Sequence, residues 1–272
     1  MTQQIPQDLP AHPEPTPEMT GVRNFRDVGG LPTTDGRSVR PGRLFRSGHL
    51  AHATETDAEF LASLGLHTVF DFRNRADRAL EGPDVELPGV RNVNIPLSDP
   101  ADGGEFWRIV REGGLDRLRA LLGEGRAAAR MAESYREMVR HRTPEHGRVV
   151  RALAEDSVPA LLHCAAGKDR AGLSIAVTLL AIGVDREAIT ADYMASNAPH
   201  NRYRLLRGDD TPETRDPEVT ELLAPLFEAR PEYLDAAYET VDAHWGGVER
   251  YLAEGLGLTP ATRERLRDRL LD

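Results

Sequence analysis

One short segment of the chain, His163–Arg170 (HCAAGKDR), concentrates side chains that could do chemistry. Cys164 is the only cysteine, and Lys168, four positions later, is the only lysine among the 34 basic residues. An ionised thiol is a nucleophile, and the planar guanidinium of an arginine such as Arg170 can hold two oxygens of one oxyanion. These residue types at this spacing favour a nucleophile that faces a bound anion.

The residues on either side predict a strand, a loop and a helix. Val158–His163 (VPALLH) is typical of a buried strand, and Gly172–Ile182 predicts an apolar helix. Such a turn points successive backbone N–H groups into one concavity at the positive end of the helix dipole, which makes an anion site. The same field favours thiolate over thiol. The alternative is that Cys164 is a small buried hydrophobic residue with only a packing role. The surrounding pattern favours a nucleophile below a tetrahedral phosphate.

Composition limits the other possibilities. The chain has 272 residues, 40% of them apolar and 29% charged, which is an ordinary globular balance. No apolar run reaches the length of a membrane span, and no basic region followed by an apolar stretch opens the chain, so a cytoplasmic location is the default expectation. Export by a non-classical route stays open. The net charge of −10 argues against nucleic acid and stable membrane association, and no cluster has metal-ligand spacing.

Strand and helix patterns alternate along the chain and predict a single α/β domain with an excess of helices. Residues 1–18 hold five prolines and predict a disordered arm, which leaves residues 19–272 for the domain. The region 102–142 is mostly helical with breaks at glycines, and it is either a helical layer or a lid that hinges over the site. Further strands are expected at 67–72 and 90–97, and helices at 56–64, 145–155, 186–196, 218–227, 232–244 and 259–271.

Several motifs appear in a fixed order along the chain. They are Asn24–Gly30 (NFRDVGG), Leu44–Ser47 (LFRS), Asp71–Arg73 (DFR), the HCAAGKDR loop, and Asp192-Tyr193 with Ser196-Asn197. The loop resembles the Cys-x5-Arg phosphate loop of cysteine-dependent phosphatases. The whole order resembles the bacterial tyrosine-protein phosphatase family, which has protein and phosphoinositide phosphatase members. The resemblance implies a central, mostly parallel sheet flanked by helices.

The same resemblance implies a two-step reaction through a phosphocysteine, without metal or cofactor. Cys164 is then the nucleophile and Arg170 the phosphate clamp. Lys168 adds a second cation, as in related loops that accept phosphoinositides, and Asp169 orients the loop or influences catalysis. Many such loops have Ser or Thr after the arginine, whereas this chain has Ala171. The phosphate cradle would consist of Ala165, Ala166, Gly167, Lys168, Asp169 and Arg170.

The reaction also needs a general acid for the leaving oxygen and a base for the attacking water. Asp99 follows the strand VNIPL and opens a loop with Pro100, a placement that resembles the mobile acid loop of tyrosine phosphatases. Asp71 is the alternative, although the neighbouring Arg73 indicates a structural ion pair. We therefore expect Asp99 to be the acid.

The leading hypothesis is a phosphomonoester hydrolase that acts on phosphotyrosine proteins, with phosphoserine, phosphothreonine or phosphoinositides as further substrates. A small-metabolite phosphatase of a biosynthetic pathway would use the same chemistry. A module that binds phosphorylated ligands without hydrolysing them is the third alternative, since Ala171 removes the hydroxyl that helps the sulfur leave. No pattern indicates the oligomeric state.

Overall fold

The structure is a computed structural model, and it describes residues 19–98, 104–203, 205 and 216–272. The expected proline-rich arm, residues 1–18, lies outside the described residues, and so does Asp99. The other sequence motifs all lie within them.

A five-stranded sheet with the order β1-β2-β5-β3-β4 organises the domain. Strands β2, β5, β3 and β4 are parallel, and the short β1 is antiparallel to β2. The register places Ser47, His163, Asp71 and Asn94 side by side at the carboxyl ends of their strands. The mostly parallel α/β sheet predicted from the sequence is confirmed. The strands span β1 Arg26–Asp27, β2 Leu44–Ser47, β3 Thr68–Asp71, β4 Arg91–Asn94 and β5 Ala160–His163.

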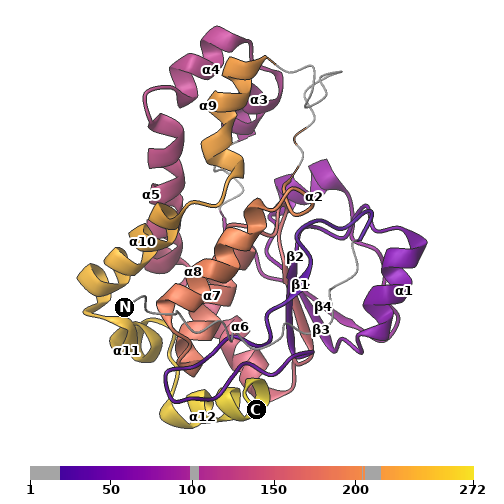
Figure 1. The fold of residues 1–272 in the computed structure, drawn as a ribbon, viewed down its shortest axis with the longest axis vertical. Coiled ribbons are helices and arrows are strands. Elements are labelled where there is room, and N and C mark those ends of the chain that lie inside the picture. Colours follow the sequence, from indigo (N-terminus) through magenta and orange to yellow (C-terminus); the bar gives the residue numbers. More distant parts are fainter. Residues whose placement is uncertain (1–18, 99–103, 204, 206–215) are drawn as a thin grey trace, which may run out of the picture.

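Each face of the sheet is covered by its own apolar cluster because side chains alternate along a strand. Leu161 of β5 packs with Leu61 of helix α1 (Glu55–Ser63) on one face. Leu162 packs with the apolar helix α7 (Arg170–Ile182) on the other. Figure 1 shows α1 on one side of the sheet and α6 (Thr143–Glu155), α7 and α8 (Arg186–Met194) on the other. β5 is therefore buried on both faces.

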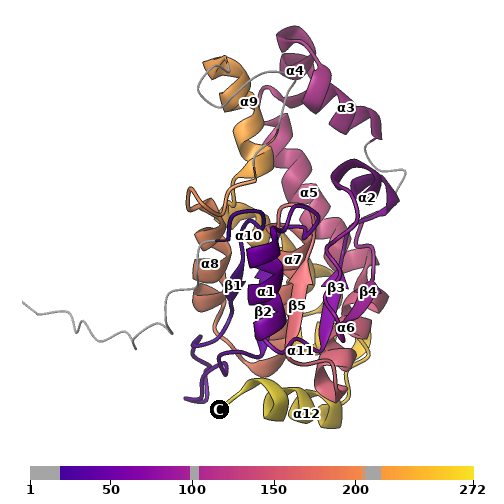
Figure 2. The same cartoon turned by 90° about the vertical axis from the view of Figure 1, so that its right-hand side faces the viewer.

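A helical arm rises beyond α2 (Arg75–Glu81), the helix that follows the carboxyl end of β3 (Figure 1, Figure 2). The helical region predicted over 102–142 is helical from residue 104 onward and is interrupted at the expected glycines, with Gly113-Gly114 before α4 and Gly123 after it. The arm consists of α3 (Gly104–Glu112), α4 (Leu115–Leu122), the upper part of α5 (Arg126–His141) and α9 (Pro217–Phe227).

Several helices differ from the sequence expectation. Helix α7 begins at Arg170, earlier than predicted, and α10 (Pro231–Thr240) ends earlier than predicted. Helices α2 and α11 (Val248–Arg250) were not predicted. A capping box between Asn74 and Asp77 holds α2, and none of its residues is buried, so it has no apolar stripe to reveal it. The C-terminal part continues with α10, α11 and α12 (Pro260–Leu270). Among the described residues, no helix is both long and apolar enough to cross a membrane.

We expect Leu162→Ala to lower the free energy of unfolding by about 2–5 kcal/mol, because Leu162 is 0% exposed and its truncation leaves a cavity between β5 and α7. Leu80→Ala, on the exposed face of α2, is the matched control and should change it by about 0.5 kcal/mol at most. Urea unfolding followed by circular dichroism measures both. Equal losses in the two variants would contradict this account of the core.

Candidate active site

The loop between β5 and α7 takes a sharp turn directly below the helix. Cys164 follows the last residue of β5 and is 1% exposed. Gly167 has a φ of +67°, and a Cβ there would clash with the backbone of Ser47. Only glycine fits here, because it adopts this positive φ readily and has no Cβ to clash with Ser47. Gly167 thus lets the loop fold tightly against the end of β2.

The carbonyl groups from Ala165 to Lys168 point away from the inside of the loop and accept hydrogen bonds from the protein around it. The amide of His49 donates to the Ala165 carbonyl at 3.1 Å. Asn24 Nδ2 donates to the Ala166 carbonyl at 3.1 Å. Arg46 Nη2 donates to the carbonyls of Gly167 at 2.7 Å and Lys168 at 3.3 Å. The N–H groups of residues 165–170 make no hydrogen bond to another described residue. Because buried amides need partners, this inward-facing row is suited to an anion.

A buried ion-pair network holds the two side chains that fix those carbonyls. Arg46 Nη1 lies 2.6 Å from Asp192 Oδ2, and Arg26 Nε lies 2.7 Å from Asp192 Oδ1. Arg26 also donates to Asn24 Oδ1 at 2.5 Å. Burial alone would raise the pKa of Asp192, but the charges and hydrogen bonds of the two arginines outweigh it and lower that pKa to about 2. Motif residues from β1, β2 and α8 thus form one support for the loop.

Helix α7 presents its N-terminus to the loop without a side-chain cap. Asp169 is the N-cap residue, yet its side chain makes no capping hydrogen bond. Instead, its Oδ1 accepts a hydrogen bond of 2.9 Å from the Tyr135 hydroxyl. Burial and the Asp169 charge raise the pKa of Tyr135, so this hydroxyl stays protonated and donates. The positive end of the helix is therefore left for a ligand.

Arg170 is positioned by the carboxyl ends of the strands around it. Its Nη1 contacts the Asp77 carboxylate of α2 and lies 3.3 Å from Ser98 Oγ and 3.5 Å from the Phe72 carbonyl. Burial would lower the pKa of Arg170, but the negative charges of Cys164 and Asp77 raise it overall. Arg170 is thus a fixed cation next to the thiol.

A second network of charges lies under the loop. Arg73 is fully buried and donates to Asp71 Oδ1 at 3.0 Å and to Asp84 Oδ2 at 2.5 Å. His163 Nε2 lies 3.3 Å from the same Asp84 oxygen. Asp71, Asp84 and His163 each offer a ligand atom within 4.8 Å, as a metal site would require. The Arg73 guanidinium already supplies the positive charge between both carboxylates, which argues for a structural network.

The ammonium of Lys168 points toward the arm. It donates to the carbonyls of Leu226 at 3.0 Å and Glu228 at 2.9 Å, and it lies 3.2 Å from Asp169 Oδ1. In this arrangement Lys168 joins the loop to the end of α9. Its predicted contact with phosphate remains a prediction, and it requires the ammonium to leave these acceptors.

An aromatic cluster borders the loop on the side of the arm. Tyr203 stacks on Phe227 with ring centroids 5.8 Å apart, and Trp107 of α3 lies 6.3 Å from Phe227. Phe227 lies between the two residues whose carbonyls hold Lys168. The Tyr203 hydroxyl donates to Glu81 of α2 at 2.5 Å. The three rings are half-buried, and Lys168 connects them to the loop through the carbonyls next to Phe227.

The structure gathers the predicted loop residues into one turn and adds side chains that sequence reasoning missed. Asp77, Tyr135 and Asp84 contact the loop or its supports. Asp77 has one visible signal, the capping-box spacing from Asn74. Asp71 is held by Arg73, as the DFR motif suggests. Asp99, the predicted acid, lies outside the described residues, and its role remains a prediction.

Comparison with known proteins places this site in a family. A sequence model of the tyrosine phosphatase family matches residues 17–272. The chain therefore belongs to the tyrosine phosphatase family, and it is a protein-tyrosine phosphatase.

The chain is similar to several curated proteins over most of its length. A protein of Cupriavidus necator named as a tyrosine-protein phosphatase is 36% identical over 239 residues, which cover 86% of this chain and 82% of that one. The triple specificity protein phosphatase PtpB of Mycobacterium tuberculosis is 32% identical, over 93% of this chain and 98% of that one. The crystal structure of P. aeruginosa TpbA matches at a TM-score of 0.31 and 20% identity, over 59% of this chain and 73% of that one, which is too distant to support an inference.

The buried network predicts how stability depends on pH. The pKa of Asp192 is about 2 in the folded chain and 3.8 for an ordinary aspartate, so its ionic contribution to stability is full above about pH 4 and is lost as pH falls toward 2. Asp192→Asn should lower the free energy of unfolding at pH 6. The difference in this free energy between the native chain and the variant should narrow by about 2 kcal/mol from pH 5 to pH 2. Urea unfolding at each pH measures this difference. A difference that stays constant would show that the Asp192 charge does not matter.

Proposed function

We propose that this phosphatase hydrolyses phosphotyrosine through a covalent phosphocysteine on Cys164. The arrangement that supports this proposal is the thiol at the base of a turn whose carbonyls are held outward by Arg46 and Asn24. The inward N–H groups of residues 165–170, the uncapped N-terminus of α7 and Arg170 would then hold the three non-bridging phosphate oxygens.

In the first step, the Cys164 thiolate attacks phosphorus in line with the leaving oxygen. A P–S bond forms and the P–O ester bond breaks, and its electron pair goes to the tyrosine oxygen. A carboxylic acid gives that oxygen a proton. Arg170 and the loop amides stabilise the charge on the equatorial oxygens of the transition state.

In the second step, a water attacks the phosphorus of the phosphocysteine. The P–S bond breaks and the sulfur leaves as thiolate, while the carboxylate formed in the first step takes the water's proton. Inorganic phosphate leaves and the enzyme is restored. Ala171 is fully buried in the first turn of α7 and offers no hydroxyl to the departing sulfur.

We assign the proton transfers to Asp99, with Asp77 as the second candidate. Asp99 is the next residue in the sequence after Ser98, and Ser98 contacts Arg170. Asp77 is a candidate because its carboxylate contacts Arg170 directly. A phosphate that binds the Arg170 guanidinium would displace this carboxylate and leave it next to the leaving group. Asp71 is less suited, because both its oxygens accept hydrogen bonds from Arg73.

The substrate range extends beyond phosphotyrosine in this proposal. The relative of M. tuberculosis is named a triple specificity phosphatase, and it aligns with 93% of this chain. Phosphoserine, phosphothreonine and phosphoinositides are therefore included as further substrates. A panel of phosphopeptides, phosphoinositides and phosphorylated metabolites at fixed pH and salt tests this range and separates it from a biosynthetic metabolite phosphatase.

Catalysis by the thiol predicts that hydrolysis of an aryl phosphate continues in the presence of chelators. Cys164→Ser should abolish turnover, because a serine hydroxyl is a far weaker nucleophile here, and the variant should still bind phosphate. Steady-state kinetics and phosphate titration by calorimetry measure the two effects. Loss of activity in EDTA with recovery on added zinc or magnesium would refute the mechanism.

The acid assignment predicts a dependence on the leaving group. Asp99→Asn should slow a phosphotyrosine peptide by about 10²–10⁴-fold and barely affect an aryl ester whose phenolate leaves unaided. The alkaline limb of its pH–rate profile should flatten, because that limb reports loss of the acid's proton. Asp77→Asn and Asp71→Asn are the matched controls. If Asp77→Asn gives this pattern and Asp99→Asn does not, the role belongs to Asp77.

A further inference from the structure

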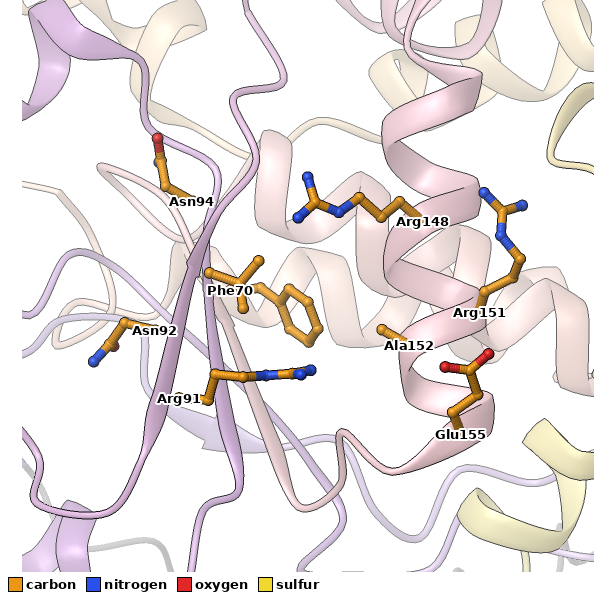
Figure 3. A pocket seen from close by; sticks show the side chains of 9 residues that line it. Phe70, Arg91, Asn92, Asn94, Arg148, Arg151, Ala152 and Glu155 are labelled. Carbon is orange, nitrogen blue, oxygen red and sulfur yellow. The ribbon is translucent and has the colours of Figure 1, made fainter.

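A groove of about 670 Å³ lies outside the phosphate loop, between the edge strand β4 and helix α6 (Figure 3). Phe70, Val93 and Ala152 give it an apolar lining. Figure 3 shows the guanidinium groups of Arg91 and Arg148 reaching into the groove from opposite sides, above and below the Phe70 ring. Nothing in the proposed reaction uses these residues.

The groove carries positive charge that the protein leaves unneutralised. Its lining holds Arg91, Arg148 and Arg151 and a single carboxylate, Glu155. Arg91 donates to Ser157 Oγ at 2.6 Å and Arg151 to the Leu256 carbonyl at 2.5 Å, both uncharged acceptors. Arg148 is exposed, and its guanidinium makes no hydrogen bond or ion pair with another described residue. A cationic groove on a chain with a net charge of −10 favours an acidic partner.

The edge of β4 offers backbone groups to an extended chain. The Arg91 amide donates to the carbonyl of His67, just before β3, and the Ile95 amide donates to the carbonyl of Asp71 in β3. The backbone groups of the odd-numbered residues in and just after β4 therefore face β3. The backbone N–H and C=O groups of Asn92 and Asn94 therefore point away from the sheet, because neighbouring residues in a strand alternate. β4 is the last strand in the order, and no strand in the described part of the chain pairs with this edge, so another strand can add there.

The groove is also continuous with the active site along the chain. After β4 ends at Asn94, the chain continues through Ile95 to Ser98, whose hydroxyl lies 3.3 Å from Arg170. Ser98 lies seven positions after Arg91, a distance that at full extension is at most about 25 Å. A peptide whose phosphotyrosine lies in the loop can therefore reach the groove with residues about four to seven positions away.

We propose that the β4–α6 groove docks an acidic, extended segment of the protein substrate, which adds a strand to β4 and places its carboxylates against Arg148 and Arg91. This proposal rests on the protein-tyrosine phosphatase function. A protein segment fits better than an anionic membrane because β4 offers a row of strand-pairing groups beside an apolar floor. The groove thus selects among phosphotyrosine sites by the residues around them.

The test compares two phosphotyrosine peptides with the full chain. One carries a short run of glutamates about four to seven residues from the phosphotyrosine, and the other has glutamines instead. Arg148→Glu should raise KM for the glutamate peptide about three- to tenfold and leave kcat unchanged, because an exposed attraction becomes a repulsion. It should leave the glutamine peptide and a small aryl phosphate unchanged. Arg265→Glu, an equal charge change on the exposed face of α12, should alter neither peptide.

A second variant tests the strand pairing. Asn92→Pro removes an N–H group that faces away from β3, so the β3–β4 hydrogen bonds remain and the aryl phosphate should be hydrolysed at the native rate. KM should rise for the glutamate peptide. An unchanged KM in both variants, or an equal change in Arg265→Glu, would overturn the proposal. So would binding of phosphatidylserine vesicles that Arg148→Glu abolishes while both peptides stay unaffected.

Failure of the proposed substrate would be recognised separately. The glutamate peptide without phosphate, labelled with fluorescein, measures docking by anisotropy and needs no turnover. If the aryl phosphate is hydrolysed and neither phosphotyrosine peptide is, the proposal of a protein substrate is wrong. Comparing the peptide affinity of Arg148→Glu with that of the native chain by anisotropy still tests whether the groove binds the acidic segment.

Discussion

The pairing of Asp192 with Arg46 and Arg26 is the interaction on which the active site depends. Arg46 is 0% exposed, and a buried guanidinium is costly unless a carboxylate and further acceptors satisfy it. Asp192 accepts from Nη1, and the carbonyls of Gly167 and Lys168 accept from Nη2, whereas Nε has no hydrogen-bond partner among the described residues. The bonds of Nη2 fix the direction of those two loop carbonyls. The amides that would bind phosphate take their direction from the same pairing.

Around this support, the site collects positive charge in a chain that is negative overall. The uncapped N-terminus of α7 and Arg170 are balanced in the free protein by Asp77, while Arg73 with Asp71 and Asp84 forms a separate network below. A phosphate dianion that replaces Asp77 on Arg170 gains the amides as well. In the proposed reaction, binding at the loop would therefore exchange one anion on Arg170 for another.

The arm and the loop are linked through Lys168. Its ammonium contacts the carbonyls on both sides of Phe227, whose ring stacks on Tyr203 and lies 6.3 Å from the ring of Trp107. A displacement of α9 would therefore change the contacts of a loop residue. The lid, one of the two alternatives for 102–142, remains a prediction, and this link would give it a physical route to the site.

The sequence by itself determined the features whose causes lie close together in the chain. The strand–loop–helix around Cys164, the breaks at Gly113-Gly114 and Gly123, and the family follow from local patterns. Helix α2 escaped prediction because it buries no side chain and so has no apolar stripe. Only the tertiary structure decided that Lys168 turns to carbonyls 58 and 60 positions later, and that Arg170 contacts Asp77, 93 positions earlier. Such contacts depend on how α9 and α2 pack at the sheet's carboxyl edge, which no local pattern encodes.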